Sequence, residues 1–271
     1  DGEAASTTNL TFANASSVTA NVNEYQTYNG TLTTGTTGAV KLNVASKLVN
    51  NAETTNFTGT LTANSASSVT IDATGGLTAT AINAEKATTV SITAGANSAA
   101  TASISAAKAT TLNVTAGSKG LAITAAAGKL EKVQTATLKT DGALSFATAN
   151  LSDAADITVS GTATTSSVSL NDLGATTLTH DVKLTATGLK AGLATGDINA
   201  GTSSSTINIS GVTGNVTLGD ITANGGVTLT ATNLGGTLAH ATGGQVIDIT
   251  TTTGKIDVDV SNAAAAVTLG T

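Results

Sequence analysis

Asp257 and Asp259 form a closely spaced pair of carboxylates that could do chemistry. They flank Val258 in a segment that alternates apolar and polar residues, so on a strand both carboxylates point to the same side. Two facing carboxyl groups are what glycoside hydrolysis requires. The sequence has no Arg, no Trp and only five Phe and Tyr residues, so it offers no anion clamp and no platform for stacking a sugar. We therefore predict that the protein is not an enzyme.

The same aspartates, with three others, suit calcium better than catalysis. Asp153 and Asp156 form a short acidic segment, and Asp172 follows an asparagine in another. Carboxylate and carbonyl oxygen atoms are the ligands that Ca²⁺ prefers, and such segments supply them. The sequence predicts candidate Ca²⁺ positions at Asp257, Asp259, Asp153, Asp156 and Asp172. The alternative is that these acids are simply solvated on an outer surface.

The two histidines do not have the spacing of a metal site. His180 and His240 lie far apart in the sequence, with no HxH or HExxH pattern around either one. Asp220, His240 and Val260 follow one another at a constant step, so they share one lateral position if the coils repeat at that step. We expect His240 to be an outward, solvated residue beside Asp220.

The elements that would position these residues repeat along the chain. Residues 82–94 read INAEKATTVSITA and residues 104–116 read ISAAKATTLNVTA, an offset of 22, and LNDLGATTLTH at residues 170–180 is a third relative. Each unit carries an apolar-polar-apolar triplet such as Val90-Ser91-Ile92, which is typical of a half-buried strand. Glycine-containing turn segments separate the triplets. A short fixed period of this kind indicates one small unit stacked on itself.

Apolar residues also form files with a constant step. In the middle of the chain, inward pairs recur at steps of 21 and 22: Val69 and Ile71, Val90 and Ile92, Leu112 and Val114. Near the C-terminus the step is 20 residues, and three files keep it. The first is Ile207, Val227, Ile247 and Val267; the second is Ile209, Leu229, Ile249 and Leu269; the third is Ile198, Leu218, Leu238 and Val258.

Two all-β folds have strands at this spacing. An antiparallel sandwich of hairpins has short strands about every 8–12 residues, but it has no reason to keep equivalent residues at one step. Stacked parallel coils do, because like residues lie above one another. We therefore predict an all-β parallel β-solenoid, similar to a β-helix or β-roll, with coils of about 20–22 residues, two main strands per coil and room for a short third one. Right-handed winding is the expectation for parallel crossovers.

Composition limits the partners and the organisation. The net charge of −6 and the absence of Arg argue against nucleic acid, and no segment reaches the length of a membrane-spanning helix. The aromatic residues Phe12, Tyr25, Tyr28 and Phe57 lie near the N-terminus, where we expect them to pack irregular first coils, with exposed contact to a neighbour as the alternative. We predict an N-terminal cap region at 1–60 and a regular solenoid at 61–271 that continues beyond the C-terminus in the native chain.

The threonine-, alanine- and glycine-rich coils, such as KATTLNVTAG at residues 108–117, and the lack of Cys resemble the repetitive region of bacterial surface-layer (S-layer) and RTX-related secreted proteins. The resemblance implies a structural role, Ca²⁺ binding and assembly into a two-dimensional lattice. It also implies an extracellular location on the bacterial cell surface, other copies of the chain as partners, and anchoring to a component such as lipopolysaccharide through a domain absent here. The Gly-Gly pairs at 225–226, 235–236 and 243–244 lack the Gly-x-Asp that completes the family's calcium nonapeptide.

Three functions follow from these patterns. The first is a structural, non-catalytic domain of a self-assembling S-layer protein. The second is a stalk of an adhesin or autotransporter-like protein. The third is an ice-binding solenoid, which needs a flat face of repeated threonines; the file Asn208, Thr228, Asp248, Thr268, taken as outward at a step of 20, is mixed and counts against it.

Overall fold

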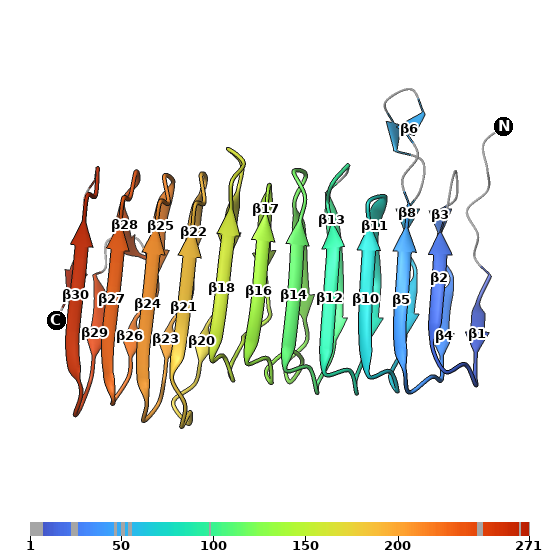
Figure 1. The fold of residues 1–271 in the computed structure, drawn as a ribbon, viewed down its shortest axis with the longest axis horizontal. Helices are drawn as coiled ribbons and strands as arrows, with labels where there is room; N and C mark the ends of the chain where they lie inside the picture. The colour runs from blue at the N-terminus through green and yellow to red at the C-terminus, as the bar shows by residue number, and fades with distance from the viewer. Residues whose placement is uncertain are drawn as a thin grey trace.

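The protein is a rod of stacked β-coils. The computed structural model describes residues 8–22, 27–45, 48–49, 52–53, 56–97, 99–242, 246–265 and 267–270. In these ranges every helix or strand assigned is a β-strand, and neighbouring strands are parallel except in one short hairpin, β6 (Leu48–Val49) with β7 (Ala52–Glu53). The first strand, β1 (Leu10–Phe12), and the last long strand, β30 (Lys255–Ser261), lie at opposite ends of the rod (Figure 1). The predicted parallel β-solenoid is therefore confirmed.

Two long sheets and one shorter sheet form the walls of the rod. Sheet I has 11 strands: β2 (Val18–Val22), β5 (Ala39–Val44), β10 (Ser68–Ala73), β12 (Thr89–Ala94), β14 (Thr111–Ala116), β16 (Thr135–Thr140), β18 (Asp156–Gly161), β21 (Val182–Thr187), β24 (Ser204–Ser210), β27 (Gly226–Thr232) and β30 (Lys255–Ser261). Sheet II has 13 strands: β1 (Leu10–Phe12), β3 (Thr27–Tyr28), β4 (Thr31–Thr34), β8 (Asn56–Phe57), β9 (Thr60–Thr62), β11 (Gly76–Asn83), β13 (Ala100–Ser105), β15 (Leu121–Ala125), β17 (Ala143–Phe146), β19 (Ser167–Ser169), β22 (Gly192–Ala194), β25 (Asn215–Leu218) and β28 (Leu238–His240).

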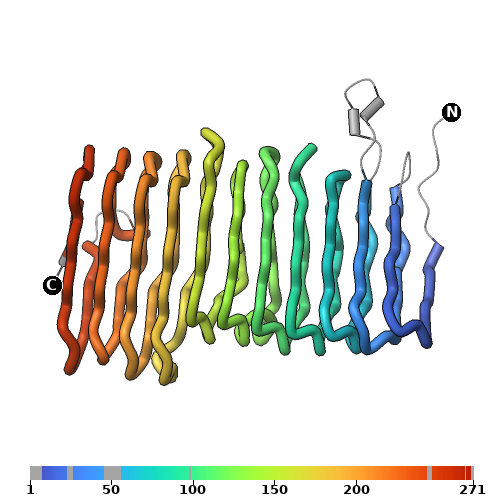
Figure 2. Tube along the Cα trace, viewed as in Figure 1, coloured from blue at the N-terminus to red at the C-terminus, as the bar shows by residue number. Residues whose placement is uncertain are grey.

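Sheet III has five strands: β20 (Leu173–Gly174), β23 (Ile198–Asn199), β26 (Ile221–Thr222), β29 (Ile247–Thr250) and β31 (Leu269–Gly270). It adds a third short wall to the C-terminal coils only. The N-terminal coils therefore have two main walls and the C-terminal coils have three, which agrees with the third strand for which the sequence left room. Figure 2 shows the coils lying side by side along the whole rod.

The core is a column of small and medium apolar residues. In sheet I, Val69 lies beside Val90 and Val90 lies beside Leu112, as the steps of 21 and 22 predicted, and all three are fully buried. In sheet II, Ile82 lies beside Ile104. Period-two alternation sends these side chains inward and the polar residues between them outward. Each coil thus covers the apolar face of the next.

The predicted step of 20 near the C-terminus is wrong. Ile207 lies beside Leu229, and Leu229 lies beside Val258. Ile247 belongs to β29 of sheet III, where its neighbour is Leu269. Because side chains alternate with a period of two, a slip of two residues keeps every inward residue inward. Polarity alone therefore cannot distinguish a step of 20 from one of 22.

The third predicted file fails for a related reason. Ile198 lies beside Ile221 in sheet III, whereas Leu218 lies beside His240 in sheet II. The true offsets here are 23 residues from Ile198 to Ile221 and 22 from Leu218 to His240, so a file with a step of 20 falls behind the coils and passes from one wall to another. The residues of this file from 198 to 238 are buried as expected, but they do not form one stack.

Of the N-terminal aromatic residues, Tyr28 and Phe57 pack inside the first coils as expected, whereas Phe12 does not. Tyr28 and Phe57 stack with ring centroids 5.6 Å apart, and Phe57 is fully buried. Phe12 is 40% exposed on β1, and Tyr25 lies outside the described residues. The parallel pairing already includes β1 and β2, so coils stack within the predicted cap region; its boundary at residue 60 and the continuation past residue 271 stay predictions.

The buried column makes a prediction about stability. Leu112→Ala removes a fully buried side chain from the middle of the rod, so we expect a loss of about 2–5 kcal/mol in the free energy of unfolding. Thr115→Ala, at an exposed position of the same strand, should change it by no more than about 0.5 kcal/mol. Urea denaturation followed by circular dichroism measures both, and equal losses would contradict the column as the source of stability.

Candidate functional site

Asp257 and Asp259 lie on β30 in register with Thr228 and Thr230. Both aspartates are exposed, and one Asp257 carboxylate oxygen is 3.6 Å from Lys255 Nζ. This ion pair is largely solvated, because the two side chains are 61% and 84% exposed. The two aspartates share the outer side of the sheet, as the alternation predicted.

Asp153 and Asp156 have different surroundings. Asp153 lies in a turn, where one carboxylate oxygen accepts a hydrogen bond from Gln134 Nε2 at 3.0 Å and the other is 3.1 Å from His180 Nε2. It therefore ties three successive coils together. Asp156 begins β18 and faces outward, in register with Thr135 and Lys183. The two acids thus do not act as one acidic turn.

Asp172 is the first member of an aspartate ladder, which consists of Asp172, Asp197, Asp220 and Asp248. In each step, a carboxylate Oδ1 accepts the backbone N–H of the next aspartate, at 3.0, 2.9 and 3.1 Å. The ladder follows one corner of the rod beside sheet III. It stacks like charges on adjacent coils while satisfying backbone donors at the start of each short strand.

Glycine precedes two members of the ladder, because a larger residue there would collide with the carboxylate of the aspartate on the coil before. A Cβ atom on Gly196 would lie 2.2 Å from Asp172 Oδ1, and one on Gly219 would lie 2.4 Å from Asp197 Oδ1. The Gly-Asp dipeptides at 196–197 and 219–220 therefore belong to the ladder geometry. They have a structural explanation that does not require a bound ion.

His240 contacts the ladder from the interior. Its Nε2 is 3.3 Å from Asp220 Oδ1, and its Nδ1 accepts the backbone N–H of Thr242 at 3.0 Å. The predicted proximity of His240 and Asp220 is confirmed. The predicted exposure is wrong, because His240 is only 8% exposed, and Val260 lies on sheet I and not in this file.

Calcium remains a prediction at all five aspartates. In the part of the chain that the structure describes, no group of three or more His, Cys, Asp or Glu residues is placed to hold a metal ion. A Ca²⁺ ion takes six to eight oxygen ligands. Any ion at these positions would need ligands from backbone, water or another molecule.

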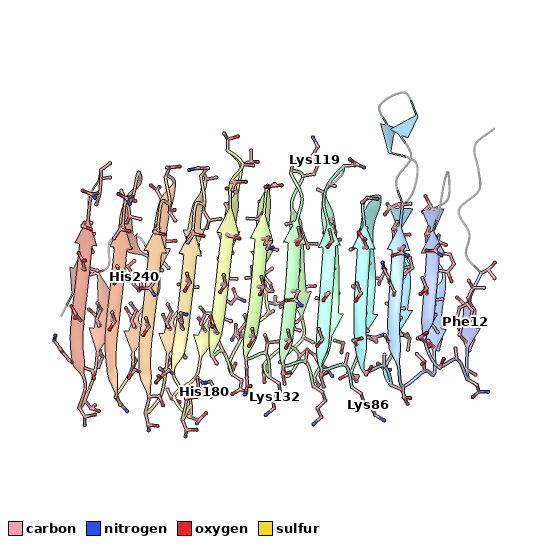
Figure 3. The ribbon with its side chains drawn as sticks, in the orientation of Figure 1. Phe12, Lys86, Lys119, Lys132, His180 and His240 are labelled. Atoms are coloured by element: carbon pink, nitrogen blue, oxygen red, sulfur yellow. The ribbon has the colours of Figure 1, made fainter. Side chains whose placement is uncertain are left out.

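The Lys129–Glu85 and His180–Asp153 pairs, which join different coils, lie along one edge of the rod, at the turns that precede the strands of sheet I. Lys129 Nζ is 2.6 Å from Glu85 Oε1, which also accepts a hydrogen bond from Ser105 Oγ at 2.6 Å. The hydrogen bond from Lys129, aided by that from Ser105, lowers the pKa of Glu85 below its usual value. Lys86, Lys132 and His180 lie along the same edge (Figure 3).

The outer surface of sheet I carries a regular array of hydroxyl groups. We define the threonine face as the outward positions of β12, β14, β16, β18, β21, β24 and β27. It consists of Thr89, Ser91, Thr93, Thr111, Asn113, Thr115, Thr135, Thr137, Lys139, Asp156, Thr158, Ser160, Lys183, Thr185, Thr187, Ser204, Thr206, Asn208, Ser210, Thr228, Thr230 and Thr232. Its only charged residues, Lys139, Asp156 and Lys183, lie in the three middle strands.

The threonines of this face differ from the threonines at the turns. At the turns, Thr88 Oγ1 donates to the carbonyl of Ser67 at 3.3 Å, and Thr110 Oγ1 donates to that of Thr88 at 3.3 Å. On the threonine face, no threonine hydroxyl has a hydrogen-bond partner among the described residues. The turn hydroxyls thus join coils, whereas the threonine hydroxyls of the face are free to bind something outside the protein; Ser91 Oγ, by contrast, accepts a hydrogen bond from Asn113 Nδ2 at 3.2 Å.

The threonine face was missed because the predicted register was wrong. Asn208 lies beside Thr230, and Thr206 lies beside Thr228. Asp248, which the step of 20 placed in the same file, belongs to sheet III. The polar residue at the centre of each apolar-polar-apolar triplet was the signal that could have revealed the face.

Comparison with protein-family models, with curated proteins and with solved structures found no match. In the described residues, no helix has the length and apolar character needed to cross a membrane.

The contact between His180 and Asp153 predicts a pH dependence. The hydrogen bond with Asp153, assisted by the carbonyl of Asp181, raises the pKa of His180 above its ordinary value of 6.5. The stabilisation by the protonated ring is therefore fully present below pH 6.5 and is lost as the pH rises through the higher folded-state pKa. Thermal unfolding of the wild type and of His180→Gln should differ most at the acidic end of a series from about pH 5.5 to 8.5. A difference that grew toward the alkaline end would contradict this assignment.

The aspartate ladder predicts opposite results for two substitutions of one residue. Asp197→Ala removes the acceptor for the Asp220 N–H, so we expect a loss of about 0.5–1.5 kcal/mol in the free energy of unfolding. Asp197→Asn keeps an oxygen acceptor and removes one of the stacked charges, so it should be at least as stable as the wild type. Urea midpoints measure both variants, and an equal loss in both would show that the charge, not the hydrogen bond, is what matters.

Proposed function

We propose that the chain is a structural, non-catalytic domain of a bacterial surface-layer protein that self-assembles into a two-dimensional lattice on the cell surface. The observation that carries this proposal is the continuous buried column, which makes the described chain one stiff rod with long, regular side walls. Rods of this kind meet their neighbours along their length. Many modest contacts along a wall then add up to firm association.

The surface chemistry supports side-by-side assembly. Sheet II has small outward residues, such as Ser145, Ser169 and Ala194, in register on neighbouring strands. Small residues let two walls approach closely, and rigid walls lose little conformational entropy when they associate. The resemblance of the coils to S-layer repeats gives the proposal its location, outside the cell, and its anchor, a component such as lipopolysaccharide bound by another domain.

Calcium enters the proposal as a bridge between copies. Asp172, Asp197 and Asp248 are exposed along one corner, and within the described part of one chain the carboxylates do not gather into a complete site. Oxygen ligands from a neighbouring copy would complete the coordination of an ion at this corner. The ion would also neutralise the stacked charges of the aspartate ladder.

Electron microscopy of the purified chain tests the lattice. With millimolar CaCl₂ we expect ordered sheets, and with a chelator we expect dispersed rods. A variant carrying Asp172→Asn, Asp197→Asn and Asp248→Asn should keep the rod, as circular dichroism would show, and lose the response to calcium. Dispersed rods of the wild type under both conditions would contradict the lattice, and sheets that ignore the chelator would remove calcium from it.

An adhesin or autotransporter-like stalk is the second candidate. The observation that favours it is that the coils follow one another in sequence order from β1 at one end of the rod to β30 at the other, as in a spacer (Figure 1). A stalk stays monomeric at high concentration, so analytical ultracentrifugation distinguishes it from a lattice protein.

A further inference from the structure

We propose that the threonine face is an ice-binding surface. This inference goes beyond the structural role above and does not depend on it. It arises from the corrected register, which moves Asp248 off this wall and places Thr206 beside Thr228, Asn208 beside Thr230 and Ser210 beside Thr232 on sheet I.

The first argument is the regularity of the face in two directions. Strands of a sheet are about 4.8 Å apart, and alternate residues of one strand are about 6.6 Å apart. Thr111 lies beside Thr135 and Thr206 lies beside Thr228, so equivalent hydroxyl groups recur from coil to coil at the strand spacing. Oxygen atoms on faces of hexagonal ice also repeat along one axis at nearly this spacing. A row of threonines can therefore meet a row of lattice waters without drifting out of step.

The second argument is that the hydroxyl groups are available and fixed. The face threonines have no hydrogen-bond partner among the described residues, unlike the threonines at the turns. Threonine is β-branched, so few rotamers are open to it beside its neighbours on a sheet. Each residue thus presents one donor-acceptor oxygen and one methyl group at a set position, and little entropy is lost when ordered water binds.

The third argument concerns charge and the competing ligand. The two ends of the face, β12 with β14 and β24 with β27, have no charged outward residue. Ice is an uncharged lattice, and the summed contribution of many weak contacts is what holds a rigid surface to it. A crystalline polysaccharide would favour aromatic side chains for stacking, and none of the residues of the face is aromatic.

Thermal hysteresis of the purified chain tests the proposal directly. We expect the wild type to lower the freezing point below the melting point and to inhibit ice recrystallisation. Thr115→Lys and Thr228→Lys, at exposed positions of the two uncharged ends, should each reduce the hysteresis, and the double variant should abolish it. Thr101→Lys, at an exposed position of β13 on sheet II, is the matched control and should leave it unchanged.

A gain of activity provides the sharper test. Lys139→Thr and Lys183→Thr remove charges that separate the two uncharged ends, so we expect the double variant to exceed the wild type in hysteresis. Circular dichroism of every variant shows whether the solenoid is retained. The proposal is overturned if the folded wild type shows no hysteresis, or if Thr101→Lys lowers it as much as Thr115→Lys does. Retention of the wild type on crystalline cellulose or chitin without any effect on ice would overturn it as well.

Discussion

Parallel stacking of one coil on the next is the constraint on which the rest of the structure depends. No single coil has a core of its own; Val90 is buried only because Val69 and Leu112 lie on either side of it. The backbone hydrogen bonds run between coils in the same direction as these apolar contacts, so the two interactions reinforce each other. The outward residues contribute little to the column. Their order is nevertheless fixed, since it follows from the register of the residues between them.

The fold could be predicted from the sequence because its signal is local and repeated. The inward pairs Val69 with Ile71 and Val90 with Ile92 gave both the strand type and the parallel order. The C-terminal register could not be predicted in the same way. Ile207 and Val227 are both inward, but Leu229 is the residue beside Ile207. A slip of two residues has no effect on polarity, so only the lengths of the turns decide between the two registers, and turn length varies along this chain.

The candidate sites, too, include features that the sequence could predict and features that it could not. The proximity of His240 to Asp220 was predicted from a step of 20, and it holds in the true register because His240 lies beside Leu218, two residues before Asp220. The aspartate ladder could not, since its members are separated by unequal numbers of residues. The Gly-Asp dipeptides at 196–197 and 219–220 were the visible signal, and the reason for the glycines, the carboxylate of the coil before, appears only in three dimensions. The threonine face depends on register in the same way.

The hairpin of β6 and β7 shows that residues can be inserted between two strands of this fold without changing the register of those strands. Val40 and Val69 lie side by side although the hairpin intervenes between them, and the next pair, Val69 and Val90, has no such insertion. Extra residues at a corner thus leave the spacing of the walls intact. The molecule is therefore a natural scaffold for display: a foreign peptide or small domain spliced into that corner would project from the rod at a defined height, while the coils above and below it kept their alignment.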